Sequence, residues 1–296
     1  MLNFSGLNCS IDVSEKCLAS EALMGEKRAI VVLGMHRSGT SSVTGALSLL
    51  GAASPRTLMP AAEDNPKGFW ESQPLMLLHD RLLAAGGSSW RDWRPFNLSA
   101  ALEAEPTLMG QARACLVDEF QEASLIVLKD PRICRFLPFW SRLLEDAGYH
   151  TMVVCPLRPP VDVANSLAFR NNMGLEEGGR LWLRHVLDAE RSSRDLPRYF
   201  VHWQVFLSGW RDQVRQIDAK LGLGLKLDNL DQPSPVDEFL SPELVRQTTS
   251  GIDLHPWTTH AWDCLCGLVN FSDDSAIQDR LDELRWKFDE ACSLFP

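Results

Sequence analysis

The sequence predicts an α/β fold in which helices flank a central parallel β-sheet on both sides, giving three layers. Short apolar runs recur at residues 29–33, 125–128, 150–155 and 199–203, and segments with a helical spacing of apolar residues lie between them. This alternation is typical of units whose strands are parallel. Polar residues follow the first three runs, at the edge of the sheet where open α/β proteins bind ligands.

Length and composition limit the classes of protein that this chain can belong to. Its 296 residues are 45% hydrophobic, enough for one large core or one core with an added subdomain. The formal net charge of −10 argues against a general nucleic-acid binder but is compatible with a small phosphorylated ligand. The eight cysteines include no Cys-x-x-Cys pair, which favours buried thiols in a reducing compartment over disulfides or metal ligands.

The sequence shows no signal for export or membrane insertion. Its N-terminus carries Asp12 and Glu15 and lacks a basic start followed by a long apolar run. No stretch reaches the roughly 18 uninterrupted apolar residues of a membrane span. We therefore expect a cytoplasmic protein without a transmembrane segment, and the sequence indicates no oligomeric state.

The stretch from Ala29 to Ser42 predicts a strand, an anion-binding loop and a helix, in that order. Two glycines allow a tight turn in which successive N–H groups converge on an anion at the positive end of the helix. Hydroxyl and guanidinium donors crowd the same loop. An ordinary strand-to-helix turn is the alternative. The residues expected to hold the anion are Gly34, His36, Arg37, Ser38, Gly39, Thr40 and Ser41.

The position of the cation in this loop separates two families. A nucleoside-triphosphate loop has Lys directly after the second glycine, where this sequence has Thr40, and here the cation lies inside the loop at Arg37. The pattern resembles the 5′-phosphosulfate loop of the sulfotransferases that use PAPS, 3′-phosphoadenosine-5′-phosphosulfate. The resemblance extends from about Ala29 to Leu221 and implies a P-loop-like fold, PAPS as co-substrate and no metal.

A polar loop from Glu63 to Glu71 ends on two aromatic residues and a carboxylate. Glu71 is a candidate general base, because a hydroxyl acceptor must lose its proton as its oxygen attacks sulfur. The Asn-Pro-Lys-Gly-aromatic-aromatic-Glu order is similar to many bacterial sulfotransferase-like sequences, and protein-tyrosine and heparan sulfotransferases place a catalytic Glu in this region. Glu63 and His79 are reserve candidates. The alternative is that Glu71 only caps the helix that follows.

Five aromatic residues predict an apolar lip over the acceptor. Phe69 and Trp70 precede Glu71, and Trp90, Trp93 and Phe96 lie in a stretch from 86 to 96 that is rich in residues that break regular structure. Aromatic faces stack on sugar rings. The alternative is that these side chains seal the loops onto the core.

The second apolar run ends in Lys129, Asp130 and, after a proline, Arg132. A run that ends in Asp resembles the magnesium-holding strand of P-loop NTPases, so Asp130 leaves a kinase possible. The Lys-Asp-Pro order is also similar to protein-tyrosine sulfotransferases, in which the Lys sits against the transferring sulfonate. This resemblance implies that Lys129 stabilises charge. Arg132 either contacts the substrate or pairs with Asp130.

The third apolar run leads into Arg158 and two prolines that suit the start of a helix. Ser166 lies two turns into that helix, where it and Arg158 can reach one dianion together. The spacing resembles the 3′-phosphate site that distinguishes PAPS from ATP. Together with the first loop, it favours a sulfotransferase over a kinase.

The chain divides into an N-terminal arm (1–27), a sulfotransferase-like core (28–221) and an acidic helical extension packed on the core (222–296). The extension carries no chemistry that the sequence identifies. Further helices are expected at residues 41–50, 74–84, 106–122, 135–147, 179–194, 204–220 and 276–294.

These patterns together predict a sulfotransferase with Glu71, Arg37 and Lys129 in catalysis. The acceptor is expected to be a carbohydrate, a glycolipid or a small natural product. A protein tyrosine remains open, as do a P-loop kinase and a non-catalytic nucleotide-binding module.

Overall fold

The computed structural model describes residues 26–63, 65–240, 253–270 and 273–294, and in them four strands form one sheet. The strands are β1 (Lys27–Val32), β2 (Leu125–Lys129), β3 (Tyr149–Leu157) and β4 (Arg198–His202), in the spatial order β2-β1-β3-β4. All pairings are parallel, and Val31 of β1 lies opposite Leu128 and Val153 of its two neighbours. The predicted parallel sheet is confirmed.

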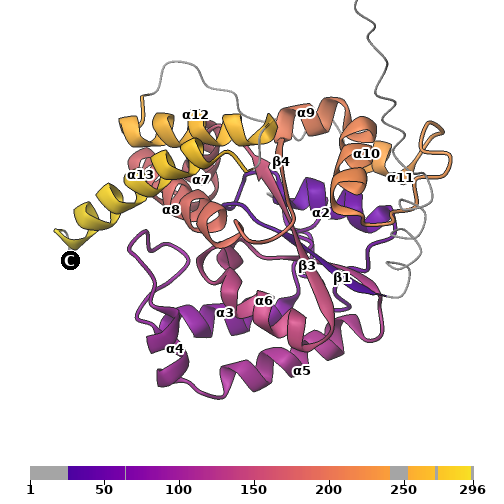
Figure 1. The fold of residues 1–296 in the computed structure, drawn as a ribbon, viewed down its shortest axis with the longest axis horizontal. Coiled ribbons are helices and arrows are strands. Elements are labelled where there is room, and N and C mark those ends of the chain that lie inside the picture. Colours follow the sequence, from indigo (N-terminus) through magenta and orange to yellow (C-terminus); the bar gives the residue numbers. More distant parts are fainter. Residues whose placement is uncertain (1–25, 64, 241–252, 271–272, 295–296) are drawn as a thin grey trace, which may run out of the picture.

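Helices cover both faces of the sheet (Figure 1). A short 3₁₀ helix, η2 (Pro131–Arg135), follows β2. The α-helices are α2 (Thr40–Leu49), α3 (Gln73–Ala85), α4 (Leu98–Ala104), α5 (Leu108–Phe120), α6 (Leu137–Asp146), α7 (Pro160–Asn171), α8 (Leu175–Ser192), α9 (Trp203–Ser208), α10 (Trp210–Leu221), α11 (Pro235–Phe239), α12 (Pro256–Asn270) and α13 (Ser275–Ser293).

The side chains of β1 alternate between two apolar cores, because successive residues of a strand point to opposite faces. Ala29 and Val31 belong to the larger core, which α3, α5, α6 and α8 complete. Ile30 and Val32 belong to the smaller core, which α2 and α10 complete. The expected three-layer arrangement is therefore present, with the carboxyl ends of the strands left to form the site.

The structure departs from the expected helices in four places. The helix expected over 204–220 is two helices, because the backbone of Gly209 leaves the helical region (φ −141°, ψ 43°). The short helices α4 and α11 and the longer α12 were not predicted. In the described residues, no helix combines the length and apolar character needed to cross a bilayer.

Helices α12 and α13 lie against α8 (Figure 1), and partly buried ion pairs join α13 to α8. Arg184 of α8 pairs with Asp289 of α13, and Asp188 of α8 accepts a hydrogen bond from Arg285. The expected division of the chain into an arm, a core and an extension stays a prediction, and residues 1–25 of the expected arm lie outside the described residues.

Candidate functional site

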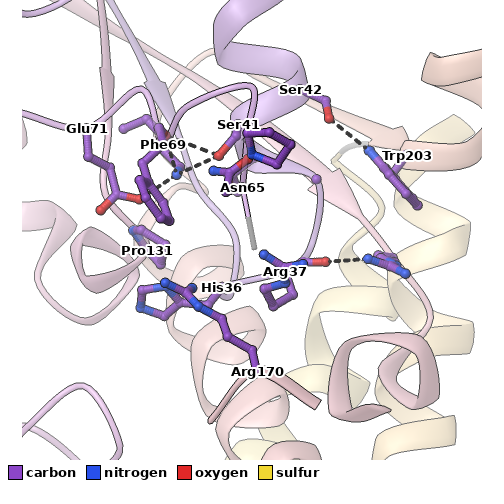
Figure 2. A pocket seen from close by; sticks show the side chains of 15 residues that line it. His36, Arg37, Ser41, Ser42, Asn65, Phe69, Glu71, Pro131, Arg170 and Trp203 are labelled. Carbon is purple, nitrogen blue, oxygen red and sulfur yellow. Dashed lines mark hydrogen bonds and ion pairs between the residues drawn. The ribbon is translucent and has the colours of Figure 1, made fainter. Parts of the chain in front are cut away.

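A cavity lies at the carboxyl ends of β1, β2 and β3, where the three strands pass into polar loops. We call it the loop cavity. Figure 2 shows its walls, with Glu71 and Trp203 on opposite sides of the view. It is lined by His36, Arg37, Gly39, Thr40, Ser41, Ser42, Asn65, Pro66, Phe69, Glu71, Lys129, Pro131, Arg158, Arg170 and Trp203.

The loop after β1 presents the N-terminus of α2 to the cavity. Arg37 (φ 71°) and Gly39 (φ 86°) both have left-handed backbone conformations. A side chain at Gly39 would be strained by this conformation, and its Cβ would lie 1.9 Å from Cδ1 of Trp203. The loop therefore needs glycine here. Gly34 and Ser38 are buried in the loop, and the Ser38 amide donates to the carbonyl of Met35.

The two anion-binding segments that the sequence predicted meet at Arg37. Its Nε donates to Ser166 Oγ at 2.8 Å, and its carbonyl accepts a hydrogen bond from Arg158 at 2.9 Å. Arg158 lies over the ring of Trp203, 4.4 Å from its centroid. Burial lowers the pKa of Arg158 to about 10, although Asp162 opposes this. The result is a positively charged wall that an anion would stabilise.

A buried ion pair lies beside the loop. Lys129 Nζ is 2.5 Å from Glu71 Oε1, and it also donates to Ser41 Oγ and to the carbonyl of Phe69. Both side chains are at most 5% exposed. Burial raises the pKa of Glu71, and the charge of Lys129 limits that rise. Lys129 thus joins the anion loop to the candidate base.

The alternative of Glu71 as a helix cap is not what the structure shows. Ser72 is the N-cap of α3, and its Oγ accepts a hydrogen bond from the Leu75 amide. Glu71 instead points its carboxylate at Lys129. A buried carboxylate held by one cation is a typical arrangement for a proton acceptor.

A second buried network lies beneath this pair. Asp130 accepts hydrogen bonds from Arg132 and from Nδ1 of His79, and Trp140 donates to Nε2 of His79. The reserve candidate His79 therefore uses both ring nitrogens inside the core. The other reserve candidate, Glu63, is exposed. Arg132 pairs with Asp130 and also with Asp80, at 2.6 Å.

The five aromatic residues expected to form one lip are placed in four different surroundings. Phe96 packs against Phe136, with ring centroids 6.2 Å apart. Phe69 lines the loop cavity, and Trp90 packs edge-on against His36 with ring centroids 5.1 Å apart. Trp70 packs instead against Phe239. Trp93 lines a separate apolar cavity.

Six residues of the lining were not among the predicted site residues: Ser42, Asn65, Pro66, Pro131, Arg170 and Trp203. Asn65 and Trp203 reach the loop cavity from segments that the sequence placed in a loop and at a strand end. Arg170 comes from the last turn of α7 and lies over the ring of Phe69, 5.3 Å from its centroid. The signal for Arg170 was its position four residues after Ser166, one helical turn further along the same face.

Comparisons with known proteins give similarity in three-dimensional structure alone. No family model matches the chain, and no curated protein matches it. The sulfotransferase domain of the Synechococcus PCC 7002 olefin synthase is 15% identical, with a TM-score of 0.45 over 81% of this chain and 95% of that domain. The sulfotransferase domain of the curacin biosynthetic pathway is 12% identical, with a TM-score of 0.47 over 83% of this chain and 98% of that domain.

A third similar structure is the sulfotransferase STF1 of Mycobacterium tuberculosis H37Rv. It is 15% identical, with a TM-score of 0.39 over 78% of this chain and 80% of that protein. All three are described as sulfotransferases. Because these identities and scores are low, the roles of the site residues depend on their own geometry.

Proposed function

We propose that this protein is a PAPS-dependent sulfotransferase, which moves a sulfonate from PAPS to a hydroxyl or amine acceptor. The observation that carries the proposal is that one cavity is lined by the anion loop, by Arg158 and by the Glu71–Lys129 pair. The loop and Arg37 hold the 5′-phosphosulfate, and Arg158 with Ser166 holds the 3′-phosphate. Two adjacent guanidinium groups at one wall suit a dianion of this kind.

The same residues account for the chemistry. The acceptor oxygen forms a bond to sulfur as the bond from sulfur to the 5′-phosphate oxygen breaks, and PAP, adenosine 3′,5′-bisphosphate, leaves with that electron pair. Glu71 takes the proton of the acceptor. Burial raises the pKa of Glu71, which makes its carboxylate a stronger base. Lys129 and Arg37 stabilise charge on the leaving phosphate. Positioning and charge neutralisation supply most of the rate in such in-line transfers.

The acceptor that we propose is a small molecule or a glycan, including a carbohydrate, a glycolipid or a small natural product. Phe69 lines the loop cavity beside Glu71, so a ring of the acceptor can lie against its face while a hydroxyl reaches the carboxylate.

A P-loop kinase is the first rival. It needs a lysine where this loop has Thr40, and it needs a carboxylate for magnesium. Asp130, the carboxylate that kept this possibility open, is buried and accepts hydrogen bonds from His79 and Arg132. These contacts favour a structural role for Asp130. A non-catalytic nucleotide-binding module is the second rival, and it would use Arg158 and Ser166 without the Glu71–Lys129 pair.

Thermal unfolding with three ligands tests the nucleotide part of the proposal. PAP should raise the melting temperature, because a ligand at a hundred times its dissociation constant adds about 2.7 kcal/mol to the free energy of unfolding. ADP, and ATP with magnesium, should have much smaller effects at equal concentration. Stabilisation by ATP with magnesium and not by PAP would contradict the proposal and favour the kinase.

A further inference from the structure

A second cavity adjoins the loop cavity on the far side of Glu71, and we call it the side cavity. Its volume is about 150 Å³, below the roughly 300–1,000 Å³ of pockets for drug-sized ligands, so it suits a single ring. It shares His36, Phe69, Glu71 and Arg170 with the loop cavity, and Figure 2 shows where these four side chains lie. The side cavity is lined by His36, Met59, Phe69, Glu71, Met76, Trp90, Arg132, Arg170 and Asn171.

Two side chains of the side cavity each have a buried polar atom without a partner among the residues described. These atoms are Nε2 of His36 and Oδ1 of Asn171. A buried polar atom left unsatisfied costs about 1–3 kcal/mol. A half-turn of the Asn171 amide exchanges Oδ1 with Nδ2, and the neutral imidazole of His36 can carry its proton on either nitrogen, so each side chain can offer the cavity a donor or an acceptor. Two unsatisfied side chains in one wall indicate a ligand with at least two hydrogen-bonding groups.

The charges around the side cavity are balanced. Arg132 pairs with Asp130 and Asp80, and Glu71 pairs with Lys129. Together with Arg170, the residues of these pairs comprise three cations and three anions. Burial and the charge of Arg132 lower the pKa of His36 well below its usual value, so its imidazole is neutral. The side cavity therefore lacks the excess positive charge that an anionic acceptor would need.

We infer that the acceptor is a neutral polyol, in which the hydroxyl that reacts has a second hydroxyl on the adjacent carbon. The inference rests on the proposed sulfotransferase function. The reacting hydroxyl gives its proton to Glu71 as its oxygen takes the sulfonate. The neighbouring hydroxyl, which can donate one hydrogen bond and accept another, bonds to both His36 and Asn171. The C–H face of the ring lies against Phe69 and Trp90. A phenol, with one hydroxyl, leaves these polar groups unsatisfied.

Calorimetry with two alcohols of nearly equal size tests this inference. The protein is saturated with PAP and titrated with cis-1,2-cyclohexanediol or with cyclohexanol. The diol should bind about fivefold more tightly, because one added hydrogen bond is worth roughly 1 kcal/mol and satisfies a buried group. Equal affinities, or no binding of either alcohol, would overturn the inference.

A substitution in the side cavity tests whether Asn171 causes the preference for the diol over cyclohexanol. Asn171→Leu should remove most of the preference for the diol and leave PAP affinity unchanged, because Asn171 lines the side cavity and not the loop cavity. The control is Phe169→Leu, which alters the same end of α7 at a side chain that is 81% exposed, and it should keep the preference. If PAP itself does not bind, the proposed function fails. If PAP binds and the diol is not preferred, only this inference fails.

Discussion

The loop cavity and the side cavity share a wall but are built in opposite ways. In the loop cavity, Arg37 and Arg158 gather positive charge against the N-terminus of α2. In the side cavity each cation of the ion pairs is matched by an anion, and the unsatisfied groups are the neutral side chains of His36 and Asn171. The first arrangement suits a dianionic nucleotide and the second a neutral acceptor. Glu71, in both walls, lies where the reaction must occur.

The largest effect that we expect comes from the shared wall. Glu71→Gln should reduce turnover by about a hundredfold to ten-thousandfold, the usual contribution of a positioned proton acceptor, and leave PAP affinity nearly unchanged. Sulfonate transfer and PAP calorimetry on the same preparation would measure both. A rate near that of the unmodified protein would remove Glu71 from the role of base.

The network beneath the site should matter for stability. Asp130→Asn should lower the free energy of unfolding by about 3–5 kcal/mol, because it leaves buried partners uncompensated. Burial alone would raise the pKa of Asp130, but Arg132 and His79 hold it well below its ordinary value. This stabilisation is therefore complete above the ordinary aspartate pKa and is lost as the pH falls below it.

The matched control for this prediction is Asp80→Asn. The Asp80 side chain is 44% exposed and pairs with the same arginine, so its substitution should cost at most about 1 kcal/mol. Chemical denaturation of both variants would measure the difference. Equal losses would show that the buried network does not stabilise the site in this way.

The loop cavity gives the third prediction. Arg158→Ala should weaken PAP by about 1.5–3 kcal/mol, the usual value of a charge-assisted contact, and should affect adenosine 5′-phosphate much less because it lacks the 3′-phosphate. Calorimetry with both nucleotides separates these effects. If both ligands lose the same affinity, Arg158 does not bind the 3′-phosphate.

The smallest effect concerns pH. Because burial raises the pKa of Glu71, kcat/KM should fall as the pH decreases through a value above 4.5, where the carboxylate takes up a proton and can no longer act as a base. The fall should be absent from Glu71→Gln. A pH profile that keeps the same acidic limb in the variant would assign the titration to another group.

Elements that follow from a local pattern could be predicted from the sequence. The buried strands, the glycine loop and the Arg158–Ser166 spacing lie within short stretches, and the structure contains each of them. Lys129 and Glu71 were both named, but their contact across 58 positions was not, because it depends on how the loop before α3 folds back onto β2.

Other features arise from tertiary packing and had no local signal. Helix α12 starts at Pro256 and is rich in tryptophan, histidine, threonine and cysteine, which favour a helix less than alanine or leucine does. The sequence placed Trp70 and Trp93 in one aromatic lip. In the structure, Trp70 packs against Phe239 and Trp93 lines a separate cavity. Asn171 reaches the side cavity because α7 ends beside it, and no spacing in the sequence indicated this position.

Transfer of a labelled group tests the central claim most directly. The protein is incubated with cis-1,2-cyclohexanediol and with either sulfur-labelled PAPS or γ-phosphate-labelled ATP plus magnesium, and the alcohol is recovered. Our account predicts that label from PAPS appears in the alcohol in amounts equal to the PAP released, that no label comes from ATP, and that Glu71→Gln slows the transfer. Label transferred from ATP, or binding of PAP without transfer to any hydroxyl or amine acceptor, would contradict it.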